Sequence, residues 1–250
     1  MKKWVFLTMA LMMPLFFTAC NEDDNTADSG TLKLSITDAP LDSAGVTGVH
    51  ITVSEVQYHV KDNEWKTFEE FEGPKSYNLL ELTDGKSEML GQFDLGPGTY
   101  TQLRFMLDAA ERGQGTPSNP GCYLEFQDGT TQALFVPSGG QSGYKATGEF
   151  TVPSNGTVEL TADFDARKSV VQAGNSGMFI LKPTIRLVAN NEAGTIGGAV
   201  TNLPEGSEAV IYAYENDTYT EEEAADPADE ESVRFPNAVT SDMFDEEGAY

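Results

Sequence analysis

Apolar and polar residues alternate along much of this chain, with the period of two that is typical of half-buried β-strands. Leu32, Leu34 and Ile36 share one side of such a run, and the stretch 99–108 repeats the pattern. The expected strands are 31–37, 49–53, 56–60, a weaker one around 65–68, 77–82, 89–95, 99–108, one on each side of 128–129, one ending near 152, 158–164 and 177–188. Long helical periods do not occur. The pattern therefore predicts an all-β fold, a mostly antiparallel β-sandwich over residues 31–190.

Local signals place turns and a bend within this sandwich. Asp128-Gly129 and Asn155-Gly156 each join two alternating runs, and such dipeptides indicate β-hairpins. The apolar face changes parity at Ser54-Glu55, which predicts a β-bulge that bends a long strand. Pro183 interrupts the last run and belongs at an edge or a bulge, because proline has no N–H to donate.

A second, smaller β unit is expected over residues 194–250, after a short linker. Residues 194–200 and 209–214 read as strands, 235–241 as a third candidate, and 221–231 as an acidic loop. So short a sandwich would bury little surface. We therefore expect it to be incomplete, either truncated at the C-terminus or completed by another chain.

The first 19 residues have the pattern of a secretory signal peptide. Two lysines precede an apolar run over residues 4–19, which is short for a membrane span. Phe17-Thr18-Ala19-Cys20 then resembles the lipobox of bacterial lipoproteins. The resemblance implies that residues 1–19 are removed and that lipid on Cys20 anchors the protein to a membrane. An uncleaved membrane anchor is the alternative.

Residues 20–30 are polar and charged, which predicts a flexible acidic tether. Glu22, Asp23 and Asp24 follow Cys20 and resemble the signal that exports some Gram-negative lipoproteins to the outer face of the outer membrane. A plain solvated linker is the alternative interpretation.

The charge of the chain restricts its partners. It holds 15 Lys and Arg against 40 Asp and Glu, and the loss of Lys2 and Lys3 with the signal peptide leaves a net charge of −27. Such a surface repels nucleic acid and attracts cations. We expect no nucleic-acid partner.

Four motifs carry a resemblance to a known family. They are Thr37 to Pro40, Gly98 to Arg104, Asp163 to Val171 and Leu181 to Arg186, which look like the motifs of domain-of-unknown-function family 4382. The resemblance covers residues 30–190 and implies a β-sandwich lipoprotein domain with no assigned activity and no catalytic residues to transfer. Residues 194–250 resemble the carboxypeptidase regulatory-like (transthyretin-like) sandwich.

The sequence contains no nucleophile elbow, P-loop, dinucleotide fingerprint, zinc spacing or EF-hand loop. His50 and His59 alternate with apolar neighbours and are expected on the surface. Cys122 shares a face with Leu124, which indicates a buried small apolar residue.

One group of carboxylates is a candidate cation site. Asp163 and Asp165 share one face of a strand, and Asp38 and Asp42 lie after the first strand, where they could meet that pair across a sheet end. Carboxylate oxygens are the ligands that calcium prefers. Calcium is the one candidate ion, and we expect no other cofactor. The alternative is that these aspartates accept backbone N–H groups in the turn beside Ser169.

Three function classes remain open. The favoured one is a non-catalytic, lipid-anchored module of the cell surface that binds a glycan or a protein or serves in a surface assembly. The second is an accessory subunit of an outer-membrane nutrient-uptake system, and the third is a carboxylate-based hydrolase. The first rests on analogy at the level of the fold.

Overall fold

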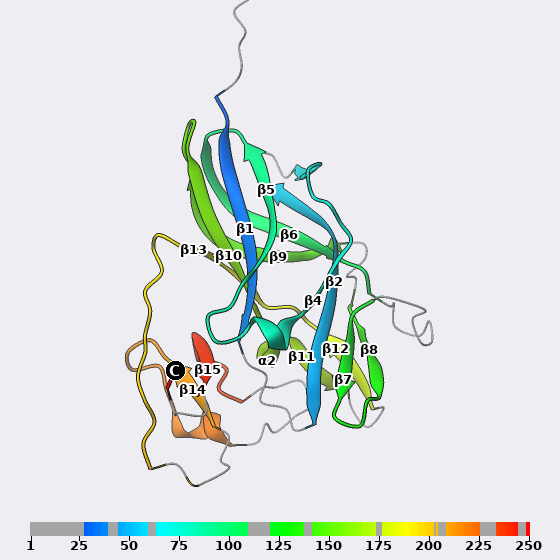
Figure 1. Cartoon of the computed structure of the whole chain (residues 1–250), viewed down its shortest axis with the longest axis vertical. Coiled ribbons are helices and arrows are strands. Elements are labelled where there is room, and N and C mark those ends of the chain that lie inside the picture. The colour runs from blue at the N-terminus through cyan, green and yellow to red at the C-terminus, as the bar shows by residue number, and fades with distance from the viewer. Residues whose placement is uncertain are drawn as a thin grey trace, which may run out of the picture.

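The computed structural model describes residues 28–39, 45–59, 64–109, 121–137, 142–173, 177–202, 204, 209–225, 234–244 and 249–250 (Figure 1). The strands are β1 (Gly30–Ala39), β2 (Val46–His59), β3 (Trp65–Thr67), β4 (Lys75–Asn78), β5 (Glu88–Leu95), β6 (Gly98–Leu107), β7 (Tyr123–Phe126), β8 (Thr131–Phe135), β9 (Tyr144–Val152), β10 (Thr157–Asp165), β11 (Val170–Ala173), β12 (Met178–Leu181), β13 (Ile185–Ala189), β14 (Val210–Ala213) and β15 (Thr240–Met243). This predominance of strands confirms the all-β class.

The helices are single turns: η2 (Leu79–Leu82), α2 (Ala166–Ser169) and η4 (Glu221–Ala224). Among the residues described, none of the helices has the length and apolar character needed to cross a membrane.

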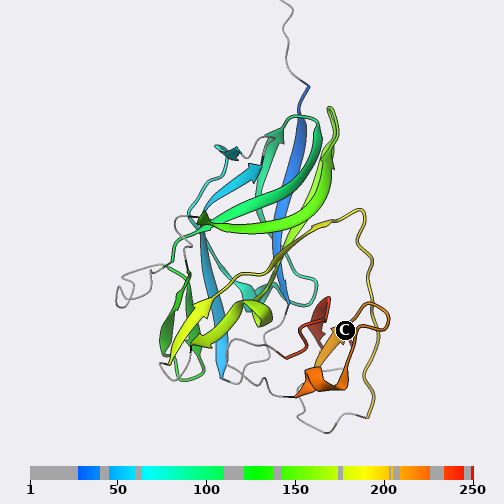
Figure 2. The ribbon, with the colours of Figure 1, turned by 180° about the vertical axis from the view of Figure 1, so that it is seen from behind.

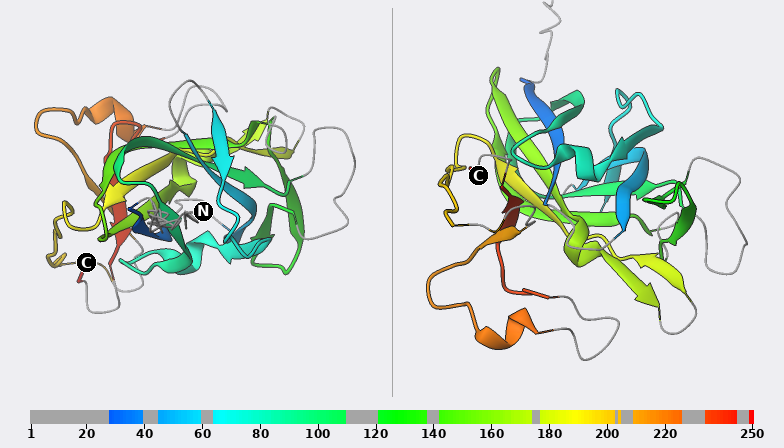
Figure 3. Two further views of the ribbon diagram at one scale, coloured as in Figure 1. Left: turned by 90° about the horizontal axis from the view of Figure 1, so that it is seen from above. Right: turned by 60° about the horizontal axis from the view of Figure 1, so that its bottom comes forward.

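Strands β1 to β13 form one continuous sheet in the order β11-β12-β8-β7-β2-β6-β9-β13-β10-β1-β5, with β3 and β4 both paired to β2. The sheet curves around its own interior, so that strands from its two ends enclose a common core (Figures 1 and 3). The single turn η2 contacts both β1 and β2 and covers one side of this core. We call this sheet with η2 and α2 the first unit.

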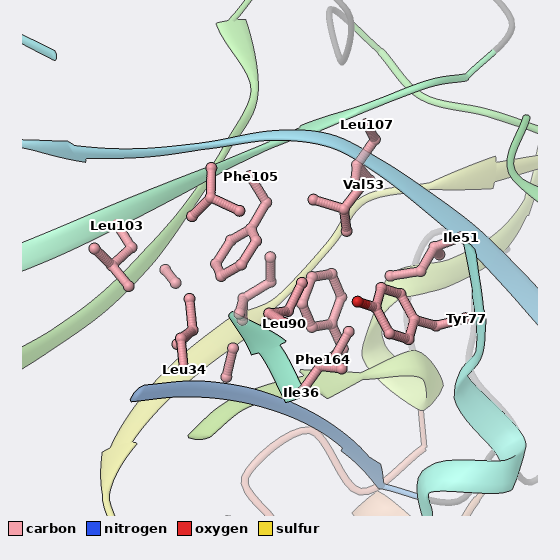
Figure 4. Packing of buried hydrophobic residues seen from close by; sticks show 14 of the residues in the cluster. Leu34, Ile36, Ile51, Val53, Tyr77, Leu90, Leu103, Phe105, Leu107 and Phe164 are labelled. Atoms are coloured by element: carbon pink, nitrogen blue, oxygen red, sulfur yellow. The ribbon is translucent and has the colours of Figure 1, made fainter. Parts of the chain in front are cut away.

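The core follows from the alternation along the strands. Leu34 and Ile36 of β1 are fully buried, as are Val53 of β2 and Leu103 and Phe105 of β6. Figure 4 shows these side chains pointing toward one another from the facing strands. Burial of their apolar surface is worth about 25 cal/mol per Å² and supplies the main stabilising term of the sheet.

Two local signals are confirmed. The register between β2 and β6 shifts between Val53 and Glu55, which is the predicted bulge. Asp128-Gly129 lies between β7 and β8, which pair antiparallel as a hairpin.

Other expectations need correction. Asn155-Gly156 turns the chain between β9 and β10, but these strands are not paired, because β13 lies between them. The predicted strand 77–82 is instead the end of β4 and the turn η2, in which the Asn78 side chain accepts the backbone N–H of Leu80. The predicted strand 177–188 is two strands, β12 and β13, which join distant parts of the sheet on either side of Pro183.

Pairing in the sheet is mostly antiparallel, as predicted, but three pairs are parallel: β1 with β10, β9 with β13, and β8 with β12. The first is the longest, with nine aligned residues from Thr31 opposite Thr157 to Ala39 opposite Asp165. Parallel pairing brings the carboxyl ends of β1 and β10 to the same edge. That edge carries the candidate site.

A second unit consists of the antiparallel pair β14–β15, the turn η4 and a single bridge between Ala199 and Ala249. Strand β14 confirms the predicted strand 209–214. Within the predicted strand 194–200 only the bridge at Ala199 forms. The third strand, expected over residues 235–241, is found instead at β15. The second unit lies beside the carboxyl end of β1 (orange and red in Figures 1 and 2).

Candidate ligand pocket between the two units

A cavity of about 670 Å³ lies where the two units meet. The first unit contributes residues from β1, β10, β13 and the turn after η2, and the second contributes residues from β14 and β15. We call this cavity the inter-unit pocket. Thr37 holds the turn after η2 against β1, because its hydroxyl donates to the carbonyl oxygens of Leu82 and Lys86 at 2.9 and 2.6 Å.

Asp38 lies at the base of the inter-unit pocket and is only 7% exposed. Its Oδ1 accepts the backbone N–H of Ala166 at 2.8 Å, whereas its buried Oδ2 has no hydrogen-bond partner. Burial raises the pKa of this carboxyl well above its ordinary value, and the charges of Asp163 and Asp165 add to the increase. A buried polar atom without a partner is rare in folded proteins.

The parallel register brings the predicted aspartates together. Thr37 lies opposite Asp163 and Ala39 opposite Asp165, so Asp38 lies between the two β10 carboxylates along the strand pair. The register places Asp38 at the same end of the strand pair as Asp163 and Asp165, but within β1 and not in a loop after the first strand as expected. Asp42, the fourth member of the predicted group, lies outside the described residues.

Asp163 belongs to an ion pair across the sheet. Its Oδ2 lies 2.7 Å from Nη2 of Arg186, which is directly opposite on β13. Burial raises the pKa of Asp163, and the guanidinium of Arg186 opposes that increase. Both side chains line the inter-unit pocket.

Asp165 is occupied by the turn α2. Its Oδ1 accepts the backbone N–H of Lys168 at 3.1 Å, and its Oδ2 lies 3.2 Å from Nη2 of Arg167. Asp38 also accepts an N–H from this turn, so the capping interpretation describes what both carboxylates do here. Among the described residues, no three His, Cys, Asp or Glu side chains converge as they would around a metal ion. Calcium binding stays a prediction.

Two basic side chains hold the second unit against the first. Arg167 Nη1 donates to the carbonyl oxygens of Arg234 and Phe235 at 2.9 and 2.7 Å, and Lys168 Nζ donates to that of Ala238 at 2.7 Å. The Arg167 guanidinium also lies over the ring of Tyr212, 5.2 Å from its centroid. Sequence analysis missed this role, although two adjacent basic residues in so acidic a chain are a visible signal.

A second place where the units meet brings two carboxyl groups together. Asp84 lies at φ 58° in the turn after η2 and lines the inter-unit pocket together with Asp242 of β15. Burial raises the pKa of Asp242, and the neighbouring Asp84 raises it further. The neighbouring Ser241 is 6% exposed, and its Oγ is buried without a partner.

Within the second unit, Glu223 connects η4 to the segment before β15. Its carboxylate accepts the side-chain and backbone N–H groups of Asn237 at 2.9 and 3.2 Å, and the hydroxyl of Tyr214 at 3.3 Å. Burial, followed by the charge of Glu223, raises the pKa of Tyr214 to about 12. Glu223 thereby places the Tyr214 side chain at the inter-unit pocket.

The remaining residues from sequence analysis lie elsewhere. His50 is half-buried, stacks on Tyr123 with ring centroids 4.4 Å apart, and lies 3.2 Å from Glu125. His59 packs edge-on against Trp65. Cys122 is fully buried, as predicted, and burial raises the pKa of its thiol to about 12. Cys20, Glu22, Asp23 and Asp24 lie outside the described residues.

Comparison with known proteins gives one match. Residues 29–183 match a family described as Domain of unknown function (DUF4382). No curated protein and no solved structure matches the chain. The matched range ends within the first unit and does not include the second.

Proposed function

We propose a function from the premise that this chain belongs to the DUF4382 family, whose shared domain has no assigned function. In this proposal the protein is a lipid-anchored module of the cell surface that binds a glycan, without catalysis, in the inter-unit pocket.

The inter-unit pocket is the observation that carries the proposal. A volume of about 670 Å³ falls within the range of about 300–1,000 Å³ that small-ligand sites occupy. Its lining combines the carboxylate of Asp163, the guanidinium of Arg186, the amide of Asn190 and the rings of Tyr212 and Tyr214. Planar polar groups and aromatic rings suit the hydroxyls and the apolar faces of a sugar.

The positions of the carboxyl groups favour binding over hydrolysis. A hydrolase of the two-carboxylate type needs an acid and a base that both reach the scissile bond. Asp163 is bound to Arg186, and Asp165 caps α2. Asp38 is thus the one described member of this group with a buried oxygen that has no partner, and a single carboxyl does not supply both an acid and a base. We therefore assign these carboxylates to structure and recognition.

The predicted tether leads into β1 at the end opposite to the pocket. The strand begins at Gly30, next to the predicted tether, and Asp38 lies near its other end (Figure 1). Eight residue steps of about 3.3 Å separate the two by about 26 Å. A lipid on Cys20 would thus leave the inter-unit pocket facing away from the membrane. With the acidic residues 22–24, this supports an outer-membrane location that faces the exterior.

A glycan array tests the binding function. We expect residues 21–250, produced without the anchor, to bind a subset of oligosaccharides and to leave them intact. Calorimetry with one bound oligosaccharide should then show at least a tenfold weaker affinity for Arg186→Ala. Lys33→Ala is the matched control, because it removes an exposed β1–β10 ion pair outside the pocket.

Three results would contradict the proposal. They are the absence of any bound oligosaccharide, an unchanged affinity in Arg186→Ala, and cleavage of the bound sugar, which would favour the hydrolase.

A further inference from the structure

The inter-unit pocket has an excess of negative charge. Its lining includes Asp38, Asp84, Asp163 and Asp242 against Arg186 as the one basic side chain among the described lining residues. Arg186 is already bound to Asp163. Lys86 lies 3.7 Å from Asp84 but does not line the pocket. The pocket therefore offers more negative charge than its own cations neutralise.

Two buried polar atoms in this lining lack partners, and they come from different units. Asp38 Oδ2 belongs to β1 and Ser241 Oγ to β15, and both residues are more than nine-tenths buried. Burial of such atoms without partners costs free energy, which a ligand with donor groups would recover. A carboxylate accepts hydrogen bonds only, whereas a hydroxyl both donates and accepts.

We propose that the inter-unit pocket takes an organic ligand that carries a primary ammonium group, which binds at the Asp38 carboxyl while a further polar group of the ligand binds Ser241. This inference rests on the proposed binding function and names its ligand class. An ammonium group has three donors and no acceptor, which matches Asp38 Oδ2. It requires only one or two carboxylates, whereas a calcium ion requires six to eight oxygen ligands.

The ligand would contact both units. Asp38 and Asp163 lie on the first unit, and Ser241 and Asp242 lie on the second. A ligand held by both sides stabilises their docking, because it binds only the docked arrangement. An acidic chain also raises the local concentration of cationic ligands.

The test uses two sugars that share one backbone and differ in whether their amino groups are free or acetylated. They are a β-1,4-linked glucosamine trimer, which carries ammonium groups, and its fully N-acetylated counterpart, which is neutral. We expect calorimetry of residues 21–250 to show at least tenfold tighter binding of the glucosamine trimer. The difference should shrink as sodium chloride rises from 0.05 to 0.5 M, because salt screens the attraction between charges.

Variants assign the binding to the inter-unit pocket. Asp38→Asn keeps Oδ1 for the Ala166 amide but cannot ionise when an ammonium group binds beside it, and it should weaken binding of the glucosamine trimer at least tenfold. Ser241→Ala should weaken the binding of both trimers. Glu159→Gln is the control, because it neutralises an exposed carboxylate of β10 outside the pocket. Thermal melting without ligand confirms that each variant is folded.

The outcomes separate this inference from the proposed function. Equal binding of the two trimers would overturn the ammonium inference and leave glycan binding intact. Spermidine, an amine without a sugar, is measured as the third compound. Binding of spermidine alone, lost in Asp38→Asn, would support the ammonium inference and contradict the glycan function. Absence of binding by all three compounds would overturn both. Stabilisation by calcium, without binding of any amine, would overturn the inference and favour the calcium prediction.

Discussion

Asp38 is the residue whose environment departs furthest from what its side chain prefers. It is an acid at the end of a strand, where solvent would normally surround it, and the second unit and α2 bury it instead. One oxygen is bound by the Ala166 amide, and the other is left without a partner. This combination makes Asp38 a sensitive point for both stability and recognition.

The raised pKa of Asp38 predicts a pH-dependent stability difference. In the unfolded chain Asp38 ionises near pH 4, whereas burial keeps it protonated to higher pH in the folded protein. Between these two pKa values the unfolded state has lost the proton that the folded state retains, so this group lowers stability as pH rises. We expect Asp38→Asn to gain stability relative to the wild type between pH 4 and pH 7.

Urea denaturation of both proteins at pH 4, 5, 6 and 7 measures this difference. The gain should be about 1.4 kcal/mol for each unit by which the folded pKa exceeds the unfolded one. Carboxylates that do not interact with Asp38 titrate equally in both proteins and cancel in the comparison. A difference in unfolding free energy that is the same at every pH would show that Asp38 ionises normally.

At the scale of elements, the single turn α2 connects the two units. Asp165 caps the turn from within β10, and Arg167 and Lys168 extend from it to three carbonyl oxygens of the second unit. This turn thus places two basic side chains next to backbone carbonyl oxygens of the second unit, to which they donate hydrogen bonds. Apolar burial in β14 and β15 is limited, because every residue of these strands except the polar Ser241 is only partly buried.

Arg167→Ala should loosen the second unit. The variant removes the charged guanidinium that donates to the carbonyl oxygens of Arg234 and Phe235. Hydrogen bonds from a charged donor are worth about 1.5–3 kcal/mol each. We expect hydrogen exchange in β14 and β15 to become at least tenfold faster, while exchange in β6 stays unchanged.

Arg104→Ala is the control, because Arg104 packs on Trp65 within the first unit, 4.2 Å from the ring centroid. Unchanged exchange of β14 and β15 in Arg167→Ala would show that other contacts hold the second unit.

At the scale of the whole molecule, strand β1 links the predicted anchor to the inter-unit pocket. The described chain enters β1 at the end farthest from the second unit (Figures 1 and 2). A pocket at the distal end is useful to a module that must meet ligands outside the cell.

Protease treatment of intact cells tests this orientation. We expect protease to digest the wild type, because residues 22–24 would direct it to the outer face of the membrane. A variant with Glu22, Asp23 and Asp24 changed to Ala should be protected and should still incorporate labelled fatty acid. Cys20→Ala should lose the fatty acid and is the control for anchoring. Protection of the wild type would place the protein in the periplasm.

Local patterns in the sequence were sufficient for the strands and several of their connections. Alternation placed β1, β5, β6 and β10, and Asp128-Gly129 and the parity change at Ser54-Glu55 identified a hairpin and a bulge. These features depend on backbone preferences and on which side of a strand is apolar, and both are written in neighbouring residues. The same reasoning placed Asp38 near Asp163 and Asp165, because it required only that two strand ends meet.

Which strands pair, and what the units share, was decided only by the tertiary structure. Asn155-Gly156 has the sequence of a hairpin turn, yet β13 lies between β9 and β10 in the sheet. The pairing partner of a strand depends on the packing of all the strands and not on the turn alone. The contacts of Arg167 with carbonyls nearly 70 residues away, and the approach of Asp84 to Asp242, leave no periodic trace in the sequence. The inter-unit pocket is formed by such contacts, since backbone carbonyls and single carboxyl groups can accept partners from any part of the chain.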